Sequence, residues 1–168
     1  MEKVLPVLVM MMAVASAAPA PALLNSTGNA RDFSPCPDRP DWFVLGDRCV
    51  KYFTDETDFT SAVLSCRRNN AYLISICDQE TNEALHDFIV ESTGQESKIW
   101  IGGFTVYCDP GWNKKYLYID GEIPAWYNWY PNYPTQAGRC VLMNEHGAGK
   151  WSNGNCEENN PYVCAFKI

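Results

Sequence analysis

The sequence lacks the groups that a structural zinc ion or a polyanion would bind. It has only two histidines, His86 and His146, and no Cys-x-x-Cys pair, so the closely spaced ligands of a structural zinc site are missing. The composition is acidic, with a net charge of −7 and no cluster of Lys and Arg, which disfavours binding to nucleic acid or to an anionic membrane. The apolar run from Val4 to Val14 is too short for a membrane span, which needs roughly 20 residues.

The first residues have the pattern of a secretory signal. Lys3 precedes the apolar run, and the small residues Ala15-Ser16-Ala17 follow it. We expect a signal peptide over residues 1–17, cleaved near Ala17 or Ala18. The mature protein is therefore expected to be secreted and extracellular, where its cysteines form disulfides.

Residues 18–34 are rich in Ala, Pro, Ser, Thr and Asn and have no structural period. They are expected to form a flexible N-terminal extension or propeptide, which contains the only glycosylation sequon, at Asn25. Residues 35–168 are long enough for one compact, disulfide-stabilised domain.

No signature of catalysis is present. The sequence has no nucleophile with a base at recognisable spacing, no phosphate-binding glycine loop and no assignable glycosidase carboxylate pair. An activated thiol is hard to keep in an exported, cysteine-rich chain. We therefore expect a binding protein and no enzyme.

Residue patterns predict an α+β fold. Asp58 can cap a helix whose apolar face contains Phe59, Ala62, Val63 and Cys66. Asp78 can cap a second helix with Thr81, Leu85, Phe88 and Ile89 on one face, ending at Gly94. Strand or extended patterns occur at Trp42–Leu45, Arg48–Phe53, Tyr72–Ile76, Lys98–Gly103, Lys115–Ile119, Arg139–Asn144 and Tyr162–Ile168.

The stretch from Glu122 to Gly138 has little regular pattern and many Pro, Asn, Tyr and Trp residues. A long irregular stretch in a small domain is often functional, and its aromatic residues argue for order. We expect a long, ordered surface loop here.

Several motifs occur in one order over Cys36–Ile168. They are Trp100-Ile101-Gly102-Gly103, the spacing from Gly121 to Trp129, and the series Cys140, Trp151, Cys156 and Cys164. Together they resemble the C-type lectin-like domain in its long form. The resemblance implies two helices packed on small antiparallel sheets, with a long ligand-bearing loop.

Eight cysteines allow 105 pairings, which spacing alone cannot resolve. The resemblance implies the pairs Cys36 with Cys49, Cys66 with Cys164 and Cys140 with Cys156. Cys77 and Cys108 lie outside this set. They either pair with each other, or one or both bridge two subunits. We expect a homodimer, which is disulfide-linked if these cysteines bridge the subunits.

The resemblance also locates a calcium site whose ligands are largely missing. Counting back from Cys140 places the family's ligand triplet on Tyr130-Pro131-Asn132, and counting forward from Trp129 places it on Tyr133-Pro134-Thr135. The late glutamate position falls on Gly138, and the last ligand pair becomes Ser152-Asn153. Because no carboxylate remains to balance a calcium ion, we predict no metal and no cofactor at this site.

A sugar can still be bound by aromatic stacking and by amide, hydroxyl and carboxylate groups. Candidate carbohydrate-binding residues near the family's site are Tyr130, Asn132, Tyr133, Gln136, Glu145, His146, Ser152, Asn153 and Asn155. The alternative for Tyr130 and Tyr133 is that they only pack the shortened loop. Trp129 and Trp151 are expected in the core.

The sequence is most similar in kind to fish mucus lactose-binding C-type lectins and to regenerating-protein-like lectins. This similarity implies a calcium-independent lectin of innate immunity that binds bacterial surface glycans or mucins through galactose-type sugars and agglutinates as a dimer. Two alternatives are a type II antifreeze-like ice-binding protein and a protein-binding lectin-like module without sugar activity.

Overall fold

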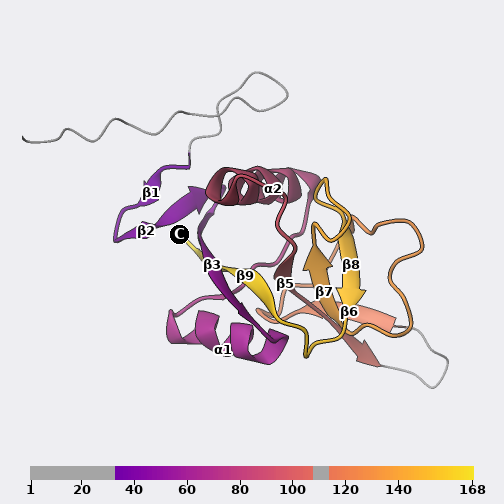
Figure 1. The fold of residues 1–168 in the computed structure, drawn as a ribbon. Helices are drawn as coiled ribbons and strands as arrows, with labels where there is room; N and C mark the ends of the chain where they lie inside the picture. The colour runs from indigo at the N-terminus through magenta and orange to yellow at the C-terminus, as the bar shows by residue number, and fades with distance from the viewer. Residues whose placement is uncertain (1–32, 108–113) are drawn as a thin grey trace, which may run out of the picture.

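The computed structural model describes residues 33–107 and 114–168. The expected signal peptide, Asn25 and Cys108 lie outside the described residues. The described part has the predicted α+β fold, with two helices and nine strands (Figure 1). In chain order these elements are β1 Pro35–Cys36, β2 Arg39–Leu45, β3 Arg48–Thr57, α1 Phe59–Arg68, β4 Tyr72–Leu73, α2 Gln79–Thr93, β5 Ile99–Tyr107, β6 Lys114–Tyr118, β7 Cys140–Met143, β8 Trp151–Gly154 and β9 Asn160–Lys167.

The strands form one connected sheet rather than the separate small sheets expected. Its order is β1-β2-β3-β9-β5-β7-β8, with β4 also paired to β9 and β6 to β5. Most pairs are antiparallel, but β5 and β9 meet in parallel at Trp100 and Tyr162. This single parallel contact joins what would otherwise be two antiparallel sheets.

Both helices begin as predicted, and α2 also ends as predicted. Asp58 accepts a hydrogen bond from the Ser61 N–H at 3.0 Å, and Asp78 accepts one from the Thr81 N–H at 2.7 Å. Such N-caps satisfy backbone N–H groups that have no partner within the helix. Gly94 ends α2 with a φ of 73°, a conformation that glycine adopts without strain.

The two helices cover opposite sides of the sheet (Figure 1). Leu85, Phe88 and Ile89 of α2 pack in one apolar cluster, and Phe59 and Ala62 of α1 pack in another. The predicted face of α2 needs one correction. Asn82 is buried on this face, because its side chain has hydrogen-bond partners inside the domain. Thr81 is only partly buried.

Three disulfides have the pairing that the resemblance implies. Cys36–Cys49 joins β1 to β3, Cys66–Cys164 joins α1 to β9, and Cys140–Cys156 joins β7 to the turn before β9. Cys77 is partly buried and forms no disulfide with any cysteine of the described residues. Burial raises the pKa of this thiol. Because Cys108 lies outside the described residues, the pairing of these last two cysteines stays a prediction.

Candidate functional site

The long loop between β6 and β7 is built on three tryptophans. Trp151 is 2% exposed, and its indole N–H donates a 2.8 Å hydrogen bond to the side chain of Asn82. The rings of Trp126 and Trp129 meet Trp151 edge to face, at 5.6 and 5.7 Å between centroids. Trp151 is therefore in the core as predicted, and Trp129 packs partly buried beside it. The three packed tryptophans hold the loop against the core.

Immediately after Trp129, the loop presents an aromatic cluster that we call the Tyr130 cluster: Tyr130, Tyr133 and His146. Tyr130 stacks on His146 with ring centroids 4.1 Å apart and planes 24° apart. Tyr133 lies 5.2 Å from His146 and 6.3 Å from Tyr130. The Tyr130 residue nevertheless keeps 38% of its surface exposed. Two segments 16 positions apart in sequence thus form one rigid aromatic surface.

Hydrogen bonds fix the turn that carries His146. The buried side chain of Asn144 accepts a 2.9 Å bond from the Gly149 N–H and lies 3.2 Å from Nδ1 of His86 on α2. Its amide nitrogen donates to the Ser97 carbonyl at 3.3 Å. The predicted site did not include Asn82, His86 or Asn144. The one sequence signal for these residues was Asn82, a polar residue on an otherwise apolar helix face.

The structure gives Asn153 a role inside the domain. Its side-chain oxygen accepts from the Thr135 N–H at 2.7 Å, and its nitrogen donates to the carbonyls of Thr135 and Gly138 at 2.9 and 2.7 Å. Ser152 is also buried, and its hydroxyl has no hydrogen-bond partner among the described residues. These two candidates are therefore buried beneath the loop and are not part of the exposed Tyr130 cluster.

Gly138, the residue that the resemblance aligns with the family's glutamate, has no room for a side chain. A Cβ atom at this residue would overlap the backbone carbonyl of Asn153. Any side chain here would require the loop or β8 to shift. Within residues 33–107 and 114–168, no three His, Cys, Asp or Glu side chains converge to hold a metal ion.

The remaining predicted residues divide by position. Glu145, next to His146, pairs with Lys98 at 3.5 Å, and Asn132 is exposed with a φ of 70°. Gln136 is exposed on the same loop. Asn155 accepts a 3.2 Å bond from the Glu157 N–H, which stabilises the turn after β8. Of the nine candidates, the structure thus joins Tyr130, Tyr133 and His146 directly and places Glu145 beside them.

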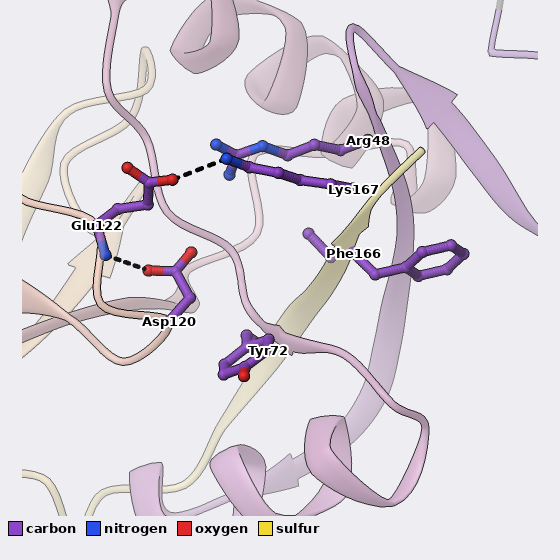
Figure 2. A pocket seen from close by; sticks show the side chains of 7 residues that line it. Arg48, Tyr72, Asp120, Glu122, Phe166 and Lys167 are labelled. Atoms are coloured by element: carbon purple, nitrogen blue, oxygen red, sulfur yellow. Dashed lines mark hydrogen bonds and ion pairs between the residues drawn. The ribbon is translucent and has the colours of Figure 1, made fainter.

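A second site could not be predicted from local sequence. A cavity of about 330 Å³ lies between the start of β3, β4, the turn after β6 and the end of β9 (Figure 2). Its lining residues are Arg48, Tyr72, Asp120, Glu122, Ala165, Phe166 and Lys167. They come from four separated segments, so no motif marks them. We call this space the basal cavity.

Comparison with known proteins identifies relatives of the described domain. Residues 55–166 match the family model of the lectin C-type domain. Lithostathine from Rattus norvegicus is 28% identical over 123 residues, which are 71% of this chain and 72% of lithostathine. Ladderlectin from Oncorhynchus mykiss is 27% identical over 123 residues, which are 71% of this chain and 63% of ladderlectin.

Solved structures have the same fold. Human lithostathine superimposes with a TM-score of 0.68 and 26% identity, covering 79% of this chain and 100% of its own. Herring type II antifreeze protein gives a TM-score of 0.65 and 26% identity, covering 79% of this chain and 99% of its own. Neither helix in the described residues has the length and apolarity needed to cross a membrane.

Proposed function

Because the chain belongs to the lectin C-type domain family, we propose that it binds carbohydrate without calcium through the Tyr130 cluster. The observation that carries this proposal is the exposed, stacked pair of Tyr130 and His146 on the loop after Trp129. The apolar face of a sugar ring packs well on an aromatic surface, and stacking of Tyr130 on His146 holds that surface in place. Little side-chain freedom is then lost when the ligand binds.

Polar groups around the cluster would orient the sugar. Glu145 can accept hydrogen bonds from hydroxyls, while Asn132 and Gln136 can both donate and accept them. The carboxylate of Glu145 pairs with Lys98 at 3.5 Å, and hydrogen bonds that involve charged groups are the stronger kind. A galactose-type sugar such as lactose is the ligand we propose to test first.

Calcium independence is supported by the state of the family's ligand positions. Both N–H groups of the Asn153 amide donate to Thr135 and Gly138 and its oxygen accepts from Thr135, while Gly138 has no room for a carboxylate. Calcium needs six to eight oxygen ligands, several of them charged. The exposed side chains left at the triplet, Tyr130 and Asn132, supply no carboxylate and fall far short of that number.

The biological setting follows as part of the same proposal. A secreted lectin with this surface would bind bacterial surface glycans or mucins in innate defence. A homodimer would present two such clusters and agglutinate particles through avidity, even if each sugar is bound weakly. We propose a binding role and no catalysis.

A glycan-binding screen with and without a calcium chelator tests the proposal. We expect binding that the chelator leaves unchanged and that Tyr130→Ala reduces by about tenfold, because a stacked aromatic contact contributes about 0.5 to 1.5 kcal/mol beyond the area it buries. Tyr127→Ala is the matched control, since Tyr127 is an exposed tyrosine of the same loop that contacts Trp129 and Trp151 rather than His146.

Three outcomes would count against the proposal. Binding that disappears in chelator would refute calcium independence, and equal loss in both tyrosine variants would show that the Tyr130 cluster is not the contact surface. A negative screen together with measured thermal hysteresis would favour the ice-binding alternative, for which the similarity to herring type II antifreeze protein provides support.

A further inference from the structure

The basal cavity has basic groups on one side and acidic groups on the other. Arg48 and Lys167 extend into it from β3 and β9, and Asp120 and Glu122 face them from the turn after β6 (Figure 2). Tyr72 and Ala165 add apolar surface to the lining, while the Phe166 ring turns away and packs against Trp42 at 5.2 Å. The four charged side chains have a formal net charge of zero.

The deeper part of this arrangement is fixed by Ser75. This residue is fully buried, and its hydroxyl donates to Asp120 at 2.6 Å and accepts from Nη1 of Arg48 at 2.7 Å. The Ser75 carbonyl accepts a second bond from the same nitrogen at 2.8 Å. Among the described residues, the other terminal nitrogen of Arg48, Nη2, has no hydrogen-bond partner. The two bonds to Ser75 therefore fix the Arg48 guanidinium, and its Nη2 can donate to a ligand.

The outer part is closed by one exposed ion pair. Lys167 Nζ lies 2.8 Å from Glu122 Oε1, and the two side chains are 64% and 39% exposed. An exposed pair of this kind adds little stability, because water solvates both charges well when they separate. It can therefore open at small cost, unlike the buried contacts of Ser75.

We propose that the basal cavity binds a small zwitterion of the α-amino-acid class, which inserts between Lys167 and Glu122. The ligand carboxylate pairs with Lys167 and the free nitrogen of Arg48, and the ligand ammonium pairs with Glu122 and Asp120. Its apolar side chain lies against Tyr72 and Ala165. The cavity volume of about 330 Å³ is at the small end of the range for ligand pockets, which suits such a molecule.

Charge balance selects this ligand class over others. Inserting a zwitterion replaces one ion pair with two, so every charge in the cavity remains compensated. A simple anion would pair with Lys167 and Arg48 but leave Glu122 and Asp120 without a counter-ion, and a simple cation would do the reverse. A neutral polyol would have to separate the ion pair without replacing either charge.

Nuclear magnetic resonance of the full mature chain tests the proposal, with L-leucine as the probe. We expect L-leucine at millimolar concentration to shift the amide resonances of residues 120–122 and 165–167 saturably. N-acetyl-L-leucine, which lacks the ammonium, and L-leucinamide, which lacks the carboxylate, should each bind at least about tenfold more weakly. Lactose serves as the neutral polyol.

The matched variant exchanges the outer charges. Glu122→Lys combined with Lys167→Glu keeps an ion pair, the net charge and the fold, but it reverses the direction in which a zwitterion must lie. We expect it to weaken L-leucine binding by at least about tenfold while leaving the spectrum elsewhere unchanged. No shift with L-leucine, equal binding of either analogue, shifts caused by lactose at these residues, or an unaffected charge-exchange variant would each overturn the proposal. None of these results bears on the Tyr130 cluster.

Discussion

Asn153 acts as a clamp on the long loop. Three hydrogen bonds from one amide fix Thr135 and Gly138 onto β8, and the side chain is 5% exposed. A buried amide with all these partners stabilises the fold, whereas losing one partner would leave a polar group unsatisfied at a cost of about 1 to 3 kcal/mol. The two N–H groups of Asn153 cannot donate to an external ligand without releasing the loop.

Gly138→Ala should destabilise the protein by about 1 to 3 kcal/mol, because the added Cβ meets the Asn153 carbonyl and forces the clamp to shift. Denaturant unfolding monitored by tryptophan fluorescence measures the loss. Ala137→Ser, at the exposed neighbouring residue, is the control and should leave the midpoint unchanged. Unaltered stability of Gly138→Ala would mean that this close approach is not rigid.

For single residues, the sequence could not predict which side chains of the loop turn inward. The lack of carboxylates at positions 130, 138 and 153 could be read directly once the family register was known. The inward orientation of Asn153 and the stacking of Tyr130 on His146 could not be predicted, since both depend on how the loop lies over β8. Neither contact follows from sequence spacing.

At the scale of single elements, local chemistry determined most boundaries. Asp58 accepts bonds from both the N–H and the hydroxyl of Ser61, and Asp78 caps α2 by accepting a bond from the Thr81 N–H. These signals act within one turn of helix, so the sequence alone sufficed to predict them. The strands β1 and β8 were not predicted. Trp151-Ser152-Asn153-Gly154 has weak strand propensity and is extended through its pairing with β7.

The Asp58 cap makes the stability of α1 depend on pH. Hydrogen bonds from the Ser61 side chain and backbone lower the pKa of Asp58 below its ordinary value. Because the folded-state pKa is the lower one, the contribution is complete above the unfolded value of about 3.9 and is lost as the pH falls through the folded-state pKa. Asp58→Ala should therefore cost about 1 kcal/mol of unfolding free energy at neutral pH and progressively less in acid.

Urea unfolding of both proteins from neutral pH down through the carboxylate range measures this difference. Asp58→Asn is the control, since an amide keeps the cap acceptor but does not titrate in this range. A difference between the wild type and Asp58→Ala that stays constant at every pH would contradict an ionised cap.

For the molecule as a whole, chain closure brings distant residues into contact. The Cys66–Cys164 disulfide joins α1 to the last strand across 98 residues, and β9 pairs with β3, β4 and β5. The basal cavity exists only because of this closure, since Arg48 and Lys167 come from the two ends of the domain. Paired β3 and β9 place them opposite each other, Arg48 against Lys167 in register. No local motif could have predicted that site.

Removing the long-range disulfide should therefore destabilise the protein more than removing a short-range one. Cross-linking restricts the unfolded chain, and the chain-entropy model gives about 4 to 5 kcal/mol for the loop closed by Cys66–Cys164 and about 3 kcal/mol for that closed by Cys140–Cys156. Both sulfurs of the first pair are also in residues fully buried beside Trp100, whereas Cys156 is only partly buried, so packing losses add in the same direction.

The double variants Cys66→Ala/Cys164→Ala and Cys140→Ala/Cys156→Ala leave no new free thiol and can be compared by denaturant unfolding. We expect the first to lower the midpoint further. The first variant should also lose the L-leucine shifts of the basal cavity, because the cavity is lined by β9. Sugar binding should be less affected, because the Tyr130 cluster lies on the loop held by Trp151 and Asn153. If the Cys140–Cys156 variant were the less stable one, local restraint of β7 and β8 would outweigh closure of the whole chain.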